Sequence, residues 1–303
     1  MLGLGLAASN TPAIFLPKEH WEKVYKNVSP EVVDLQPFMG KDESVEKIDA
    51  TLARYRAAFD GLRRQIEEYR PEALIIVGSD RSEMFTRINT PTFSIFTGPE
   101  VTAADGISAA PETVKGTYKI RCDGTLATAI LDGLVQKEFE MSWGSEFKPV
   151  GGSVVSHMVS APYKALVPNM NIPVVPLFIN AYSPPLPPAS RCWDLGVTLR
   201  EILAERPERV AILASGGLSY DVAGRWVDEP FDRWILDSLQ SGKAEKLKRL
   251  FTFDSENLRG PTGEIRSWIT VAAAAGGKAR VVDYIPSRQA KTGAAFAYWQ
   301  IAK

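Results

Sequence analysis

Apolar residues between positions 44 and 68 recur at intervals of three and four residues, which is the spacing of one face of an α-helix. Pro71 ends this pattern, because proline lacks the backbone N–H that a continuing helix needs. The sequence therefore predicts a long amphipathic helix. Its apolar stripe consists of Val45, Ile48, Leu52, Tyr55, Phe59, Leu62, Ile66 and Tyr69.

Short, uninterrupted apolar runs alternate with further helical patterns along the rest of the chain. An apolar run without polar alternation is typical of a strand that is covered on both faces. Strands separated by helices predict an α/β fold with a mainly parallel central sheet flanked by helices. The predicted strands are residues 2–8, 73–77, 172–179, 210–214 and 279–284, and the further predicted helices are residues 126–139, 193–204, 231–239, 244–251 and 264–275.

No repeat or low-complexity tract divides the chain, so we expect one catalytic-type domain over residues 1–303. The proline cluster at 184–188 is either a linker or a rigid loop over a pocket. Its place directly between a predicted strand and a predicted helix favours the loop. The apolar residues 1–8 follow no basic residue, which favours a buried strand over a signal peptide.

Charge and cysteine content exclude several classes of protein. The chain has 35 Lys and Arg residues against 36 Asp and Glu residues, a net charge of −1, which excludes nucleic-acid binding through a bulk basic surplus. No apolar run approaches the roughly 18 residues that a membrane span needs. Cys122 and Cys192 are too few for a disulfide framework or a thiolate metal cluster. We expect a cytoplasmic protein with a small-molecule ligand, and no binding to nucleic acid or membranes.

Polar residues gather directly after four of the predicted strands. The carboxyl ends of parallel strands meet at one edge of a sheet, where α/β proteins bind their ligands. We therefore expect a ligand site at that edge. The residues are Asn10 after the first strand, Asp80 and Arg81 after the second, Asn180 and Tyr182 after the third, and the segment 215–220 after the fourth.

Each of these residues has a structural explanation beside a functional one. Arg81 is either a surface arginine or a clamp for a carboxylate, whose shape a guanidinium matches. His157, among apolar neighbours, is either a hydrogen-bonded core residue or an acid–base group. Glu264 opens a predicted helix, whose positive end a carboxylate stabilises. The Gly216-Gly217 pair permits a tight turn, but the full glycine pattern of a dinucleotide site is absent.

Motifs in a fixed order cover nearly the whole chain. They are residues 7–13 (Ala-Ala-Ser-Asn-Thr-Pro-Ala), 76–81, 155–157, 180–185, 191–196, 215–220 (Ser-Gly-Gly-Leu-Ser-Tyr), 263–268, 282–284 and 296–299. In these motifs the chain resembles the class III extradiol ring-cleavage dioxygenase family, whose type member is the catalytic β-subunit of protocatechuate 4,5-dioxygenase. The resemblance implies the α/β fold of that family.

The family holds ferrous iron with two histidines and one glutamate, which leaves positions open for a catechol and for oxygen. By resemblance, the first histidine position is Asn10 here and the second is Arg81, whereas Glu264 matches the glutamate. The acid–base histidine of the family's Gly-Gly-Leu-Ser-His motif is replaced by Tyr220. A histidine near the substrate is retained as His157.

A neutral amide and a permanent cation at two ligand positions predict a degenerate iron site, so we expect no metal ligands and no cofactor. We expect Arg81 to pair with Glu264 instead. The candidate catalytic residues are His157, Tyr220 and Glu264, and the candidate substrate-binding residues are Asn10, Arg81, Asn180, Tyr182 and Gly217.

Three functions fit these residues. We favour a metal-independent enzyme that acts on an aromatic or ring-derived carboxylic acid, as a lyase, hydrolase, tautomerase or metal-free oxygenase. The second is a non-catalytic subunit of a ring-cleavage dioxygenase. The third is an iron-dependent dioxygenase with shifted ligands, in which His20 replaces a lost imidazole. The resemblance also implies a homodimer or a complex with a related subunit.

Overall fold

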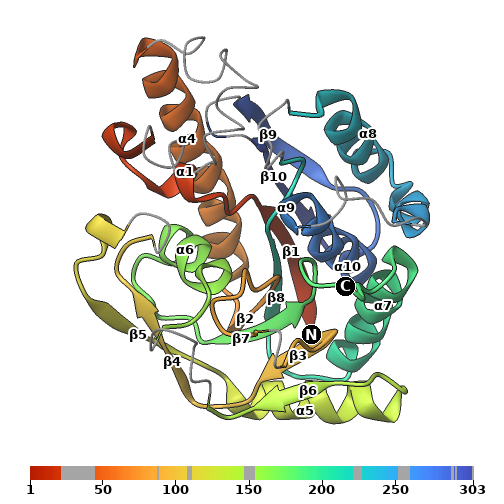
Figure 1. The fold of residues 1–303 in the computed structure, drawn as a ribbon. Helices are drawn as coiled ribbons and strands as arrows, with labels where there is room; N and C mark the ends of the chain where they lie inside the picture. Colours follow the sequence, from red (N-terminus) through yellow and green to blue (C-terminus); the bar gives the residue numbers. More distant parts are fainter. Residues whose placement is uncertain are drawn as a thin grey trace.

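In the part of the chain that the structure describes, eight strands form one central sheet in the order β6-β3-β7-β2-β8-β1-β10-β9 (Figure 1). The structure, a computed structural model, describes residues 1–21, 45–86, 89–107, 111–146, 154–220, 227–251, 260–287, 290 and 292–301. The strands are β1 (Leu2–Ala8), β2 (Ala73–Gly78), β3 (Phe93–Phe96), β6 (Ser142–Gly144), β7 (Val174–Ile179), β8 (Val210–Ser215), β9 (Arg280–Ser287) and β10 (Thr292–Gln300).

The four middle strands, β7, β2, β8 and β1, are parallel to one another. β3 pairs with β7, and β10 with β1, in the antiparallel sense, so the outer strands make the sheet mixed. β2 and β8 are buried along their whole length, as expected for strands covered on both faces. The predicted α/β fold with a mainly parallel central sheet is therefore confirmed.

Helices cover both faces of the sheet (Figure 1). One apolar core contains α4 (Val45–Tyr69) and α6 (His157–Leu166), together with a small antiparallel sheet of β4 (Glu100–Ala104) and β5 (Thr117–Arg121). The other core contains α5 (Gly124–Gln136), α7 (Ala189–Ala204), α8 (Glu229–Gln240) and α10 (Ile265–Ala275). The shorter helices are α1 (Pro12–Phe15), η1 (Lys18–His20), η2 (Pro111–Thr113), η3 (Ala244–Arg249) and α9 (Gly260–Gly263).

The predicted elements agree with these bounds except in a few places. Residues 244–249 form the 3-10 helix η3 instead of an α-helix. The sequence did not predict α6, a helix of ten residues whose regular pattern Pro162 interrupts. It also missed β10, because that strand is rich in alanine and lacks a β-branched run. The short strands β3 to β6 are too brief to show a period.

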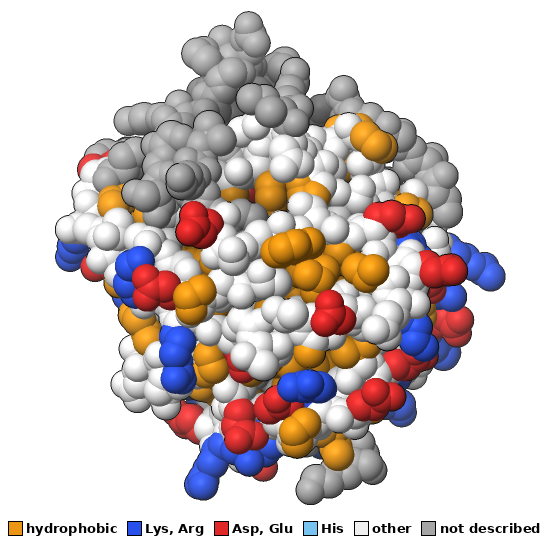
Figure 2. All heavy atoms as spheres, turned by 90° about the horizontal axis from the view of Figure 1, so that it is seen from below, with side chains coloured by type: hydrophobic (Ala, Val, Ile, Leu, Met, Phe, Trp, Pro, Cys, Tyr) orange, Lys and Arg blue, Asp and Glu red, His pale blue; other side chains and the backbone are white. Residues whose placement is uncertain are grey.

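Within the described residues, no helix is long and apolar enough to cross a membrane. On the face shown in Figure 2, acidic and basic side chains are interspersed around patches of hydrophobic ones. Such a mixed face fits the net charge of −1 and offers no stripe of positive charge for phosphates.

Helices α7 and α10 approach each other closely at Gly196. A Cβ atom at this position would lie 2.1 Å from the backbone oxygen of Thr270, a distance that real contacts do not show. The Thr270 hydroxyl donates a hydrogen bond across the same contact to the backbone oxygen of Cys192 at 2.9 Å. The absence of a side chain at Gly196 therefore allows the two helices to pack.

Replacing Gly196 tests this packing. Alanine ordinarily stabilises a helix interior relative to glycine, but here we expect Gly196→Ala to lower the free energy of unfolding by about 1–3 kcal/mol through overpacking. Urea denaturation measures the change. Asp194→Ala, on an exposed position of the same helix, is the control and is expected to change stability by less than about 0.5 kcal/mol. A stability gain in Gly196→Ala would contradict the close approach.

Candidate functional site

An ion pair between Arg81 and Glu264 lies at the carboxyl edge of the parallel strands. Arg81 Nε donates to Glu264 Oε1 at 3.0 Å, and Arg81 Nη2 donates to Glu264 Oε2 at 3.3 Å. Arg81 Nη2 also donates to Asn10 Oδ1 at 3.3 Å. The side chain of Glu264 is 1% exposed and that of Arg81 18% exposed. The pair predicted from the sequence is present, and it joins the loops after β1 and β2 to the start of α10.

Two further donors complete the hydrogen bonding of Glu264. Tyr182 OH donates to Oε1 at 2.5 Å, and the backbone N–H of Gly217 donates to Oε2 at 3.2 Å. A buried carboxylate is tolerated only when it is paired and hydrogen-bonded. The loops after β2, β7 and β8 each supply such a partner, so this single carboxylate holds three loops together.

Gly216 lets the loop after β8 run directly over Glu264. A Cβ atom at Gly216 would lie 2.5 Å from Glu264 Oε2, and the residue has a φ of +128°, which other residues rarely adopt. Trp268 Nε1 donates to the Gly216 carbonyl at 2.7 Å and holds the loop from the other side. The Gly216-Gly217 pair therefore allows the backbone of this loop to lie directly against the Glu264 carboxylate of the same protein.

Tyr220 belongs to the same electrostatic cluster. Burial by itself lowers the pKa of Arg81, but the charge and hydrogen bonds of Glu264, together with Tyr182 and Tyr220, outweigh burial and raise the pKa. Burial raises the pKa of Tyr182 well above its ordinary value, opposed by Arg81 and assisted by Glu264. Arg81 is therefore a permanent cation and Tyr182 a neutral hydrogen-bond donor at any physiological pH.

Asn10 connects this cluster to the start of α6. Its Nδ2 donates to Ser215 Oγ at 3.0 Å, and Ser215 Oγ donates to the carbonyl of Met158 at 2.7 Å. Asn10 is completely buried. The amide oxygen of Asn10 accepts from Arg81, so Asn10 orients the guanidinium. Through Ser215, a chain of hydrogen bonds links the guanidinium to α6.

Asn180 uses its side chain within its own loop. Its Oδ1 accepts from the backbone N–H groups of Tyr182 and Ser183, both at 3.1 Å, and its Nδ2 donates to the Ser183 carbonyl at 2.6 Å. The structure therefore shows Asn180 holding the turn that presents Tyr182. A cavity of about 20 Å³, room for one water, lies beside both residues.

The proline cluster at 184–188 is a loop between β7 and α7, as predicted. The buried guanidinium of Arg266 holds it: Nε donates to the Pro187 carbonyl at 2.8 Å, and Nη1 donates to the Gly263 carbonyl at 3.1 Å. The ring of Phe251 lies 4.0 Å from the same guanidinium. Arg266 was not predictable as a site residue, since an arginine in a helical pattern carries no signal of burial.

His157 is the first residue of α6, and its ring is buried with Nδ1 2.8 Å from Glu83 Oε2. Glu83 lies in the loop after β2, two positions beyond Arg81. Glu83 was not predictable as a site residue, because an isolated glutamate in a polar loop has no distinguishing pattern. The structure therefore adds Glu83 to the candidate site.

Ser219 and Asp232 anchor the loop that ends at Tyr220. Asp232 accepts from the backbone N–H and the hydroxyl of Ser219, both at 2.8 Å, and from Tyr284 OH at 2.8 Å. Asp232 is completely buried, and burial raises its pKa to about 7 against the pull of these donors. The Ser219 hydroxyl donates its hydrogen to the Asp232 carboxylate, and this bond anchors the loop to α8.

His20 lies apart from the Glu264 cluster. Its Nδ1 is 3.3 Å from Glu112 Oε1, and both residues line a cavity of about 690 Å³ together with Lys164. The described residues around this cavity include none of the predicted site residues. Across the described ranges, no group of three His, Cys, Asp or Glu residues is placed to hold a metal ion.

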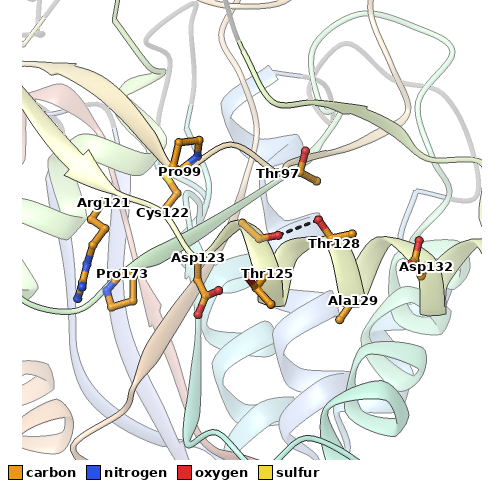
Figure 3. A pocket seen from close by; sticks show the side chains of 11 residues that line it. Thr97, Pro99, Arg121, Cys122, Asp123, Thr125, Thr128, Ala129, Asp132 and Pro173 are labelled. Carbon is orange, nitrogen blue, oxygen red and sulfur yellow. Dashed lines mark hydrogen bonds between the residues drawn. The ribbon is translucent and has the colours of Figure 1, made fainter.

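A groove of about 820 Å³ lies at the start of α5 (Figure 3). Asp123 caps this helix by accepting from the backbone N–H of Leu126 at 2.9 Å. The carboxylate thus already occupies the positive end of the helix, where an anion would bind. None of the predicted site residues is among its described lining.

The Arg81–Glu264 pair predicts strong energetic coupling. Removing one partner leaves a buried charge unpaired, so we expect Arg81→Ala and Glu264→Ala each to lower the free energy of unfolding by about 3–5 kcal/mol. The double variant should cost less than the sum of the two by about 1–3 kcal/mol. Denaturant unfolding of the four proteins measures this. The exposed pair Lys137–Glu201 is the control, and its expected coupling energy is below about 1 kcal/mol. Strictly additive losses of stability at Arg81 and Glu264 would contradict the pairing.

Asp232 predicts a pH dependence of stability. Between its ordinary pKa of 3.8 and about 7, the folded state keeps a proton that the unfolded state releases. Stability should therefore fall as pH rises through this window, by up to about 1.4 kcal/mol per pH unit, and level off above it. Asp232→Asn should remove the part of this slope that Asp232 contributes in denaturation measured from pH 4 to pH 8, and leave the part that the partly buried Asp80, whose pKa burial also raises, contributes. Asp237→Asn, on an exposed position of α8, should keep the whole slope; an unchanged slope in Asp232→Asn would contradict the assignment.

Comparison with known proteins places the chain in a family. The family model described as the catalytic LigB subunit of aromatic ring-opening dioxygenase matches residues 30–296. A 2,3-dihydroxyphenylpropionate/2,3-dihydroxicinnamic acid 1,2-dioxygenase of a Rhodococcus species is 26% identical over 82% of this chain and 89% of that protein. A gallate dioxygenase of Pseudomonas putida is 31% identical over 48% of this chain and 43% of that protein.

Apart from the Rhodococcus protein, the chain spans about half the length of the curated relatives it matches. The crystal structure of an uncharacterized protein from Escherichia coli K12 has the same fold, with a TM-score of 0.56, 16% identity, and coverage of 98% of this chain and 99% of that one. With the family model covering most of its length, the chain belongs to the LigB family of aromatic ring-opening dioxygenases.

Proposed function

We propose that this chain is a LigB-family enzyme that acts without ferrous iron on an aromatic or ring-derived carboxylic acid. The observation that carries the proposal is the Arg81 guanidinium, which lies against both Glu264 and Asn10. These are the three positions that match the metal ligands of the family by resemblance. A permanent cation thus stands where the family would place iron.

The donor set around Glu264 does not fit ferrous iron. Both carboxylate oxygens accept hydrogen bonds from Arg81, and a metal ion bound there would have to displace this guanidinium and then lie beside its charge. Asn10 contributes a neutral amide oxygen, a weaker ligand for iron than an imidazole. We therefore derive no catalytic step from a metal.

The chemistry of Arg81 supports a carboxylate ligand. Within the described part of the chain, its Nε and Nη2 are engaged by Glu264 and Asn10, and Nη1 makes no hydrogen bond. This nitrogen offers donors to an incoming anion, and the Tyr182 ring lies 5.9 Å from the guanidinium carbon. The relatives are named for aromatic acids such as gallate, which agrees with such a ligand.

The remaining polar groups supply proton transfer. His157 and Tyr220 are the candidate acid–base groups, and Glu264 orients Arg81 and Tyr182. Lyase, hydrolase, tautomerase and metal-free oxygenase reactions are each compatible with this combination of an anion clamp and a proton-transfer group. A non-catalytic partner subunit is the second candidate, favoured by the hydrogen bonds that already satisfy Glu264 within the chain.

Metal titration and ligand binding test the proposal together. We expect no stoichiometric Fe(II) binding under anaerobic conditions and no oxygen uptake with catechols or gallate. We expect gallate and protocatechuate to raise the thermal midpoint, whereas catechol, which lacks the carboxylate, does not. Arg81→Lys should lose this selectivity, because lysine cannot present the planar guanidinium. Tight iron binding with oxygen uptake would overturn the proposal, and failure of all acids to bind would favour the silent subunit.

A rebuilt ligand set provides the matched control. The double variant Asn10→His, Arg81→His restores two imidazoles beside Glu264, so we expect it to gain Fe(II) affinity at least about tenfold over the unmodified chain. The two single variants should gain less. Equal iron binding by the unmodified chain and the double variant would show that ligands elsewhere hold the metal.

A further inference from the structure

One carboxylate oxygen of Glu83 contacts three polar groups at the start of α6. Glu83 Oε2 accepts from Ser156 Oγ at 2.6 Å, from the backbone N–H of His157 at 2.9 Å, and it lies 2.8 Å from His157 Nδ1. Ser156 is the N-cap residue of α6, but its hydroxyl makes no capping bond and is directed to Glu83 instead. The carboxylate therefore does more than stabilise the positive end of a helix, since it also holds the imidazole.

The other ring nitrogen of His157 is buried without a partner. Among the described residues, His157 Nε2 has no hydrogen-bond partner, and the residue is 7% exposed. A carboxylate oxygen only accepts hydrogen bonds, so in the neutral imidazole Nδ1 carries the proton and Nε2 presents its lone pair. A buried polar atom without a partner is costly, so such an atom in a native structure needs an explanation, and a catalytic role is one of them.

The loop after β2 joins this arrangement to Arg81. The Asp80 carboxylate accepts from the backbone N–H groups of Met84 at 3.1 Å and Phe85 at 2.9 Å, which closes the loop around Glu83. Met84 Sδ also lies 3.2 Å from the backbone nitrogen of Ser156. One short, braced segment thus positions both the anion-binding guanidinium and the partner of His157.

We propose that Glu83 is a positioning residue that holds His157 in the Nδ1–H tautomer, so that Nε2 accepts a proton from a hydroxyl of the bound ring-derived acid. This inference rests on the proposed function. The substrate O–H bond breaks, an N–H bond forms on Nε2, and the electron pair stays on the substrate oxygen, so no oxidant is needed. The imidazolium that forms lies against the Glu83 carboxylate, which stabilises its charge.

This arrangement differs from a Ser-His-carboxylate relay. In such a relay the serine donates to the imidazole, whereas here Ser156 donates to the carboxylate itself. Ser156 is therefore a second anchor for Glu83. The proton acceptor is Nε2 of His157, on the side of the ring away from Glu83.

Imidazole spectroscopy tests the tautomer directly, because the chain contains only two histidines. Nitrogen-15 NMR at about pH 8, where a free imidazole is neutral, should show His157 as the Nδ1–H form, with His20→Gln assigning the other ring. Glu83→Ala should lose this preference. Glu83→Gln keeps a hydrogen-bond acceptor but not the charge, so it should weaken the preference for the Nδ1–H tautomer. This variant also controls for a loss of folding in Glu83→Ala.

Glu112→Ala is the matched control, because Glu112 lies beside His20 as Glu83 lies beside His157. It should move the His20 signals alone. An Nε2–H tautomer in the unmodified protein, or a tautomer unchanged in folded Glu83→Ala, would overturn the proposal.

Activity separates this inference from the proposed function. With an acid identified by thermal shift, Glu83→Ala should lower kcat by about 10–100-fold while KM changes by less than about threefold, and Glu83→Asp should recover part of the loss. A change in KM alone would overturn the positioning role. A tautomer switch without turnover of any tested acid would support Glu83 and overturn the proposed enzyme activity instead.

Discussion

The buried carboxylate of Glu264 is the constraint on which the carboxyl edge of the sheet depends. With 1% of its side chain exposed, its charge must be neutralised and its oxygens hydrogen-bonded inside the protein. Arg81, Tyr182 and the backbone of Gly217 do this from three different loops. The conformations of these loops are therefore interdependent, and the site behaves as one cluster.

The same ion pair determines which ligands suit the site. A guanidinium that is always charged repels cations and attracts anions, and for this reason we propose a carboxylate ligand rather than a metal ion at this edge of the sheet. The LigB family model is described as a subunit of aromatic ring-opening dioxygenases. Together, family and charge connect the fold to the class of substrate that we propose, with proton transfer assigned to the neighbouring His157.

Most of the fold was predictable because burial leaves a local trace in the sequence. The middle strands β2 and β8 are covered on both faces and appear as uninterrupted apolar runs, and the stripe of α4 repeats with the helical period. Elements outside the middle of the sheet were harder to predict from the sequence. β10 is mainly small residues, and α6 contains a proline, so neither shows a clear period.

The sequence by itself determined the α/β layout and the placement of Asn10 and Arg81 at strand ends, because strand periodicity and chain order are local properties. It also placed Glu264 at the start of a helix. Only the tertiary structure decided that Tyr182 donates to Glu264 and that Glu83 holds His157. The partners in the first contact are separated by 82 positions in the sequence, and those in the second by 74 positions. The geometry of both contacts is set by the packing of strands and helices from distant parts of the chain.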